Sequence, residues 1–387
     1  MEQEITNLML ALIRSAMGGE VLSDAERSLC TKERITAVLK LASSHDIAHL
    51  VAWGIKKTAL APELAAASES YIFKAVYRYQ QIKFEYEKLI GMLENAKIPF
   101  IPLKGSVIRS YYPEPWMRTS CDIDILIHRS DLERVQSILI DTHKYRLSDS
   151  CPHDVAFLSP TGVNVEIHFD LIEEGLVNSS AKALKNVWSA STVKEGFEYH
   201  REMADSFFYF YHIAHMAKHV LNGGCGVKPF IDLWLLDSLD TEDEKGREEL
   251  LSRGGLLRFA EVARRLYQAW FCLGGHDLLT LEMQDYVLRG GVYGSLENHV
   301  AIQRRKKGSR FKYALSLIIL PYDSIKYIYP VLQKHRWLTP VMQMHRWISL
   351  ILRGRLRKAK KTIESSNNVS DESVERAYRF LDGVGLS

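Results

Sequence analysis

The sequence has few cysteines and no recognisable pattern among them. Five occur in 387 residues, scattered singly and without a CxxC pair. An odd number without paired spacing disfavours both a disulfide framework and a zinc module. The five are Cys30, Cys121, Cys151, Cys225 and Cys272.

Long apolar runs are also missing. No run reaches the ~20 apolar residues that a membrane-spanning helix needs, and Met1–Ser15 carries acidic residues and lacks a signal-peptide pattern. We therefore expect a protein of the reducing cytoplasm. The composition, 47% apolar and 25% charged, is that of a globular protein. The length suits two or three domains of ~100–200 residues each.

Acidic residues are scarce in one part of the chain. Residues 300–361 contain 16 Lys or Arg and a single acid, Asp323, although the net charge of the chain is only +3. Such an excess of positive charge favours an anionic partner. The aromatic residues between the bases are compatible with single-stranded nucleic acid or with an anionic membrane surface. We favour an ordinary helical domain whose bases lie over a core, in which Leu315–Leu320 ends a packed helix.

Helical periodicity dominates both ends of the chain. Apolar spacing over Glu2–Ala96 fits helices, the longest over Tyr71–Asn95, and helical patterns return from about Asp205. Between them, residues 98–170 contain short alternating segments with turn residues such as Thr161-Gly162. We therefore predict an α+β fold, with a small mixed or antiparallel sheet flanked by helical segments. The predicted domains are residues 1–97, 98–200 and 201–387.

Two aspartates alternate with isoleucines in the segment Cys121–His128. In a strand, Asp122 and Asp124 lie on one face, ~6.6–6.8 Å apart along the backbone, and the isoleucines point into a core. Two carboxylates on one face repel each other unless a cation lies between them. Hard oxygen ligands on a partly open face suit Mg²⁺ or Mn²⁺. The alternative is the solvated outer face of an ordinary strand.

A second alternating segment, Val163–Asp170, repeats this pattern. Its apolar residues form one face, and Asn164, Glu166, His168 and Asp170 form the other. If the two strands are neighbours with their polar faces together, Glu166 completes a three-carboxylate cluster that can hold metal ions for in-line nucleotidyl transfer. His168 then acts as a base or as an orienting group, with Asp170 as its partner.

A short segment upstream adds groups that suit a triphosphate. Gly105 lets the backbone approach a phosphate closely, and Ser106 at a helix N-terminus can donate to it. Lys104 and Arg118 can offset the triphosphate charge, Arg118 in bidentate fashion. The alternatives are a turn glycine, a helix-capping serine and two solvated bases.

Together these motifs resemble the DNA polymerase β-like nucleotidyltransferase superfamily. Its members have an apolar residue, Gly and then Gly or Ser before an Asp-x-Asp strand, with a third carboxylate on a later strand. Here Gly105 and Ser106 fit the first part, and Asp122, Asp124 and Glu166 the rest. The gap between Ser106 and Asp122 is longer than in most members.

The closer resemblance, over about residues 45–240, is to a poorly characterised bacterial nucleotidyltransferase family within that superfamily. It implies the fold and the metal-dependent use of a nucleoside triphosphate, and it leaves the acceptor open. The matching elements are Leu103-Lys104-Gly105, Tyr112-Pro113, Arg118, Asp122-Ile123-Asp124, Glu166-Ile167-His168, His215–His219 and Phe230-Ile231-Asp232-Leu233.

Three histidines share one face of a predicted helix. His212, His215 and His219 fall at i, i+3 and i+7. The last two have the spacing of a helical metal pair, but no Glu follows His215, so the metalloprotease pattern fails. We expect this helix to line the nucleotide cleft, with Lys218 and Asp232 nearby.

Two classes of function follow from the sequence. Three convergent acids beside a Gly-Ser loop favour an enzyme that transfers a nucleoside monophosphate, most simply AMP from ATP, to a hydroxyl or phosphate acceptor. A phosphotransferase that uses the same metals is one alternative. The other is a non-catalytic module that binds a nucleotide or a polyanion.

Overall fold

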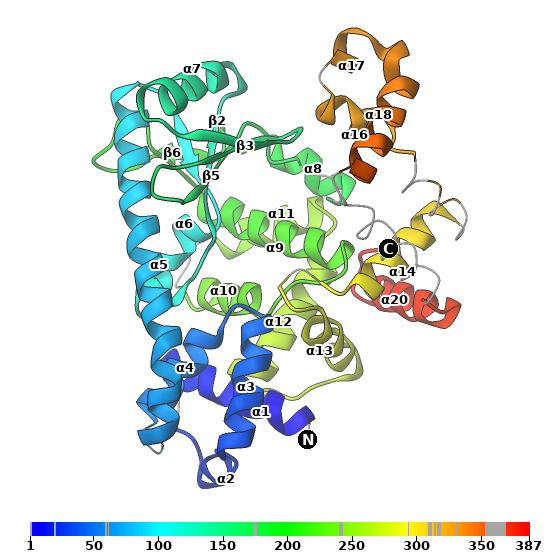
Figure 1. Ribbon diagram of the computed structural model, residues 1–387. Helices are drawn as coiled ribbons and strands as arrows, with labels where there is room; N and C mark the ends of the chain where they lie inside the picture. Colours follow the sequence, from blue (N-terminus) through cyan, green and yellow to red (C-terminus); the bar gives the residue numbers. More distant parts are fainter. Residues whose placement is uncertain are drawn as a thin grey trace.

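The computed structural model describes most of the chain. The described residues are 2–18, 21–58, 60, 62–172, 176–239, 243–292, 294–308, 312, 315, 319–329, 331–352 and 369–387. Helices surround a small sheet on several sides (Figure 1). The predicted α+β class is therefore confirmed.

The first helices of the chain form a bundle. They are α1 (Glu2–Ala16), α2 (Asp24–Ser28), α3 (Lys32–Ser44), α4 (Ala48–Lys57) and α5 (Pro62–Asn95). The 34-residue α5 runs from this bundle to the sheet along one side of the molecule (Figure 1). We predicted the start of this helix at Tyr71, but Pro62 and Glu63 already provide the fixed φ and the acid that favour a helix start.

The strands follow α5 directly. They are β1 (Phe100–Pro102), β2 (Asp122–Ile127), β3 (Arg146–Ser150), β4 (Asp154–Leu158) and β5 (Asn164–His168), with the short α6 (Gly105–Ile108) and α7 (Leu132–Ser137) between them. Their order in the sheet is β1-β2-β5-β4-β3. The β2–β5 pair is parallel and the other pairs are antiparallel. The predicted small mixed sheet is thus present.

A hairpin joins β4 to β5 at the predicted turn. Gly162 has φ +83°, a conformation that glycine adopts at little cost. Beyond the predicted β region, a two-stranded ribbon pairs β6 (Ser191–Val193) with β7 (Arg201–Met203). Strands of three residues are too short to give a period-two pattern.

One face of the sheet packs on α5 and α7. The apolar residues of β2 and β5 are buried there against the second half of α5. This cluster closes the face of the sheet that lies opposite the acids. From α5 it includes Ile82, Leu89, Met92 and Leu93, and from β2 it includes Ile123, Ile125 and Ile127.

The remaining helices belong mostly to a second, larger core. They are α8 (Asn178–Leu184), α9 (Asp205–Leu221), α10 (Lys228–Asp237), α11 (Glu244–Arg253), α12 (Leu257–Phe271), α13 (Leu278–Gly290), α14 (Leu296–Lys307) and α20 (Asp371–Gly383). Their buried side chains form one cluster with those of α1, α3 and α4. The N-terminal and C-terminal helical segments therefore share a core.

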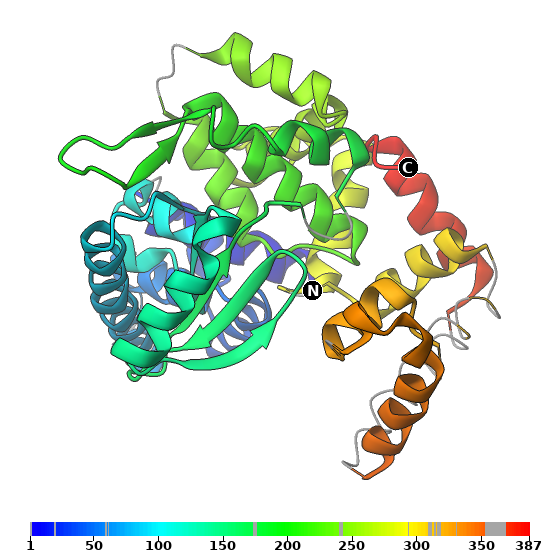
Figure 2. The ribbon, with the colours of Figure 1, turned by 90° about the horizontal axis from the view of Figure 1, so that it is seen from above.

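Part of the basic region stands apart from this body. It contains α16 (Tyr322–Ile328), α17 (Val331–Lys334) and α18 (Thr339–Leu352), drawn in orange in Figures 1 and 2. Leu315 and Ile319 are 43% and 55% exposed, so our prediction that they pack in a core is wrong. Leu317 and Ile318 lie outside the described residues.

Two further observations bear on this region. Arg304 in α14 is buried and donates to the Val369 carbonyl and to Asp371, so one base of the region is an internal structural group. None of the helices in the described part of the chain combines the length and the apolarity that crossing a bilayer requires.

Candidate active site

The parallel pairing of β2 with β5 brings the acids together. In the register of these strands, Asp124 lies opposite Glu166, and Asp122 lies opposite Asn164. Leu126 lies opposite His168. Because side chains alternate along a strand, Asp122, Asp124, Glu166 and His168 project from the same face. This is the neighbourhood that the two alternating segments predicted.

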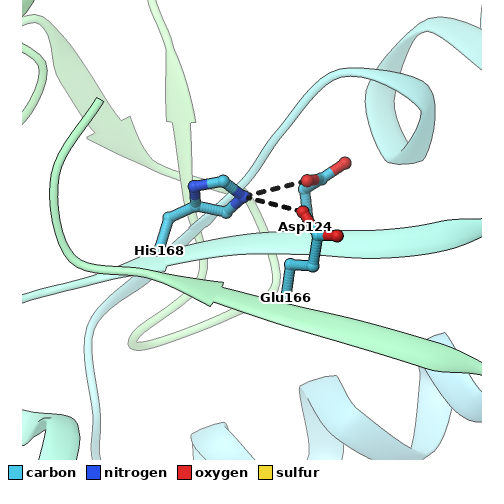
Figure 3. Close-up of side chains that lie close together, drawn as sticks. All are labelled: Asp124, Glu166 and His168. Carbon is cyan, nitrogen blue, oxygen red and sulfur yellow. Dashed lines mark hydrogen bonds and ion pairs between the residues drawn. The ribbon is translucent and has the colours of Figure 1, made fainter. Parts of the chain in front are cut away.

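The tightest cluster on this face contains Asp124, Glu166 and His168. One ligand atom from each lies within 4.8 Å of the others, and Figure 3 shows the three side chains pointing toward one another. His168 Nε2 is 2.9 Å from Asp124 Oδ1 and 3.6 Å from Glu166 Oε2. Among the described residues, this is the group with metal-binding geometry. Asp122 is outside it, and His168 takes the third place.

The charged groups of this face shift one another's pKa. Burial raises the pKa of Asp122 to about 6, with the nearby charges of Asp124 and Glu166 acting in the same direction. Burial also disfavours the charged form of Asp124, but Lys104 and His168 outweigh this effect and hold its pKa well below the usual range. Asp124 is thus held in its ionised form, whereas Asp122 keeps its proton to a higher pH than an ordinary aspartate does.

Two cationic groups neutralise Asp124. Lys104 Nζ lies 3.1 Å from Asp124 Oδ1, the same oxygen that faces His168. Burial lowers the pKa of His168, but its hydrogen bonds to Asp124 and Glu166 outweigh burial and raise it to about 9. The predicted partner of this histidine, Asp170, instead accepts a hydrogen bond from the Ile172 amide. That pairing was wrong.

The Lys104–Ser106 segment is joined to the acid-bearing strand. The Leu103 amide donates to the Asp124 carbonyl at 3.0 Å, which holds the start of α6 beside β2. Lys104 adopts φ +47°, a left-handed conformation that is uncommon for residues other than glycine. A constrained backbone therefore places Lys104 against Asp124, and Ser106 follows it, half-buried, in α6.

Gly105 is buried but not crowded. Its backbone does not need a positive φ, and an added Cβ would meet Ser120, Arg118 and Arg109 at ordinary distances of 3.5–3.8 Å. Packing within the chain therefore does not demand glycine at this position. A close approach by a bound group remains a physical reason for it.

Arg118 occupies a different place from the one predicted. Its Nε and one terminal nitrogen bind both oxygens of Asp232, at 2.7 and 2.8 Å, and its other terminal nitrogen donates to the Thr119 carbonyl. The bidentate partner is thus a buried carboxylate of α10 rather than a phosphate. Asp232 is 0% exposed and also accepts from the Tyr112 hydroxyl, so it does not face a cleft.

A second ion pair, half-buried, lies next to this one. Lys228 at the start of α10 binds Asp46, and it also donates to the carbonyl and hydroxyl oxygens of Thr119. Together the two ion pairs tie α10 and the loop before α4 to the segment that precedes Asp122. The arrangement fixes the strand that carries the acids.

The sequence alone did not identify Lys228, Asp46 or a third half-buried group, Arg109. Arg109 donates to the Gly105 carbonyl at 2.8 Å and to the Ser120 hydroxyl at 2.9 Å. Burial lowers its pKa to about 10, and the charge of Arg118 adds to this. The one signal for Arg109 in the sequence was its position four residues after Gly105.

The histidines of α9 divide into two roles. His212 is buried and its Nε2 lies 3.0 Å from the Pro229 carbonyl, so it belongs to the packing of α9 on α10. His215 and His219 have their Nε2 atoms 3.3 Å apart. Burial lowers the pKa of His215 well below its usual value, and the charge of Lys104 is the next largest cause. The charge of Lys104 therefore acts on this part of α9, where Lys218 is half-buried.

The donor set fits a hard divalent cation. Carboxylate oxygens are the ligands that Mg²⁺ and Mn²⁺ prefer, and Asp122, Asp124 and Glu166 supply them from one face. The pKa of Asp122 is raised partly by its like-charged neighbours, which is the repulsion that a bound cation relieves. The His168 nitrogen is a softer donor, suited to holding Asp124 in place by a hydrogen bond.

The fold and this face define an α+β protein that carries an acidic cluster on a mixed sheet. Residues 31–272 match the model of a family described as uncharacterised nucleotidyltransferase. The match covers more than half of the 387 residues, so the chain belongs to this family, whose description indicates nucleotidyl transfer in general. No curated protein and no solved structure matches the chain.

Proposed function

We propose that the protein is a metal-dependent nucleotidyltransferase that transfers a nucleoside monophosphate, most simply AMP from ATP, to a hydroxyl or phosphate of an acceptor. The observation that carries this proposal is the register of β2 and β5, which sets Asp124 opposite Glu166 with Asp122 on the same face. The resemblance to the DNA polymerase β-like superfamily and the membership of the family support the same reaction.

The residues divide into metal ligands and groups for the nucleotide. Asp122, Asp124 and Glu166 would hold Mg²⁺ or Mn²⁺, and the metal would supply positive charge at phosphorus and acidify the acceptor hydroxyl. His168 orients Asp124 through the bond of 2.9 Å. The oxygens of the transferred group thus meet a face whose acids are already held in place.

The triphosphate would lie along the Lys104–Ser106 segment. Lys104 is 22% exposed and already next to the acids, so its ammonium is placed to neutralise a phosphate oxygen. The uncrowded Cα of Gly105 leaves room for the close approach of a phosphate. Arg109 donates a hydrogen bond to the Gly105 carbonyl and so holds the segment in place. Arg118 is left out of the nucleotide site because Asp232 occupies it.

The position of a radioactive label decides between the possible reactions. The protein is incubated with Mg²⁺, a cell extract as the source of acceptor, and ATP labelled at either the α or the γ phosphorus. We expect the α label to enter a product and the γ label to leave in pyrophosphate. Transfer of the γ label would indicate a phosphotransferase.

A non-catalytic module would behave differently in the same experiment. It would bind ATP with metal but move neither label, and the Asp124→Asn variant would then differ from the natural chain in binding alone. For a nucleotidyltransferase, that variant removes the labelled product while the protein stays folded.

A further inference from the structure

The segment of residues 319–352, which we call the C-terminal arm, has little core of its own. It consists of α16, α17, a short 3₁₀ turn at Arg336–Leu338, and α18. Among its described side chains, Ile325 and Leu332 are the fully buried ones. The arm projects beyond the helical body in two perpendicular views (Figures 1 and 2).

Two polar side chains of helix α18 bond to the rest of the arm. Gln343 donates to the Leu320 carbonyl at 2.6 Å, and the His345 Nδ1 lies 3.0 Å from the Tyr329 hydroxyl. These contacts tie the polar positions of α18 to the rest of the arm. The half-buried side chains of the helix are both polar and apolar, Gln343 and Arg346 together with Met342 and Trp347.

A second set of apolar residues of α18, its apolar stripe, faces outward. It consists of Val341, Met344 and Ile348, which are 51%, 67% and 52% exposed. Positions i, i+3 and i+7 share one helix face. Trp337 precedes the stripe and is 74% exposed. The arm thus presents aliphatic side chains and an indole ring together, a surface that water solvates poorly.

Basic residues outnumber acidic ones in the arm. The arm contains a single acid, Asp323, and four bases: Lys326, Lys334, Arg336 and Arg346. The nine residues that follow α18, 353–361, include six Lys or Arg and no acid. An exposed apolar helix face in a segment with an excess of bases is the pattern of a helix that lies on an anionic membrane.

We propose that the C-terminal arm docks on the surface of an anionic lipid bilayer, with the apolar stripe at the acyl boundary and the bases among the headgroups. The 14 residues of α18 are fewer than the ~20 that a membrane span needs, so the helix lies in the interface. Trp337 suits the same depth, because indole rings favour the boundary between headgroups and hydrocarbon.

Two other partners fit the surface less well. A second copy of the chain would bring two arms of the same charge together, and like charges in contact disfavour such an interface. A nucleic acid would satisfy the bases but would leave the three aliphatic side chains of the stripe against sugars and phosphates. The lipid surface satisfies both the charge and the apolar face.

The test measures binding of the full chain to vesicles. We expect it to co-sediment with vesicles of phosphatidylcholine mixed with phosphatidylglycerol, and to bind vesicles of phosphatidylcholine alone much more weakly. Replacing Val341, Met344 and Ile348 by Ser should weaken binding to the mixed vesicles at least about a hundredfold, because three buried apolar side chains are lost.

The matched control changes three apolar residues outside the arm that are more exposed than those of the stripe. Val21, Phe73 and Leu278 are 71%, 71% and 76% exposed, and replacing them by Ser should leave vesicle binding unchanged. Circular dichroism establishes that both triple variants are folded. A loss of binding in the control variant would overturn the assignment to the arm.

A charge variant tests the second half of the proposal. Replacing Lys334 and Arg336, two exposed bases of the arm, by Gln should weaken binding to the mixed vesicles about thirtyfold, since each base contributes to attraction by an anionic surface. Equal binding to both kinds of vesicle would overturn the proposal. The proposal would also be overturned if the chain bound no vesicles but formed dimers that the stripe variant abolishes. Binding to RNA without binding to vesicles would overturn it as well. None of these results depends on the proposed transfer reaction.

Discussion

Lys104 and Asp124 form an ion pair at the centre of the candidate site, with Nζ 3.1 Å from Oδ1. The same oxygen lies 2.9 Å from His168 Nε2, and the pKa of that histidine is raised to about 9. Two cationic groups thus meet one carboxylate oxygen. A metal ion that binds Asp124 has to compete with both of them.

This competition predicts the behaviour of a Lys104 variant. We expect Lys104→Gln to bind Mn²⁺ about tenfold more tightly in the absence of nucleotide, because one competing positive charge is gone. Its turnover should fall, because the triphosphate loses a base. Titration of Mn²⁺ followed by electron paramagnetic resonance measures the affinity, with the exposed Lys83→Gln as the control. Weaker Mn²⁺ binding in Lys104→Gln would contradict the competition.

The carboxylates themselves should be required for the metal. Asp124→Asn and Glu166→Gln should each weaken Mn²⁺ binding by more than the ~10–100-fold that loss of an outer-sphere partner causes, and should remove detectable transfer. Asp149→Asn, at an exposed position of β3 at the far edge of the sheet, is the matched control. Calorimetry with Mn²⁺ and with MgATP provides both readouts. Unchanged affinity in Glu166→Gln would remove Glu166 from the ligand set.

Gly105 separates ligand binding from folding. An alanine there has room and needs no positive φ, so Gly105→Ala should keep or raise stability by up to ~1 kcal/mol. MgATP binding should nevertheless weaken about tenfold, because the methyl group lies where a phosphate approaches. Gly91→Ala in α5, also uncrowded, should gain similar stability and bind MgATP normally. Normal binding by Gly105→Ala would place the triphosphate elsewhere.

The buried pair of Arg118 and Asp232 should be structural. Asp232→Ala leaves the guanidinium uncompensated and should cost about 3–5 kcal/mol of stability. Removing Asp285, whose exposed pair with Arg289 lies on the surface of α13, should cost about 0–1 kcal/mol. Urea unfolding at neutral pH measures both. A small loss in Asp232→Ala would show that the pair does not hold the segment before β2.

The alternation of apolar and acidic residues was enough to predict which side chains share a face. It gave the strands of Asp122, Asp124 and Glu166 and the hairpin at Gly162, because these depend on local periodicity. It did not give the offset between β2 and β5. That offset places His168, rather than Asp122, in the tight cluster with Asp124 and Glu166.

Ion pairs between residues far apart in the chain could not be predicted from the sequence for a similar reason. Arg118 and Asp232 are 114 residues apart, and each also fits a solvent-exposed or phosphate-binding role when considered alone. Only the packing of α10 against the segment before β2 selects the partner. The short strands β6 and β7 escaped notice because three residues carry too little periodicity to distinguish a strand from a loop.

Helix α5 contributes side chains both to the core of the N-terminal bundle and to the core behind the sheet. Its 34 residues span about 51 Å at ~1.5 Å per residue. Tyr71 near its start packs on the large helical core, whereas Leu89 and Leu93 near its end lie in the core behind the acids. A fragment that began at Ile98 would leave that face of the sheet open to water. The sheet that carries the acids therefore needs the helix that precedes it to close its apolar face.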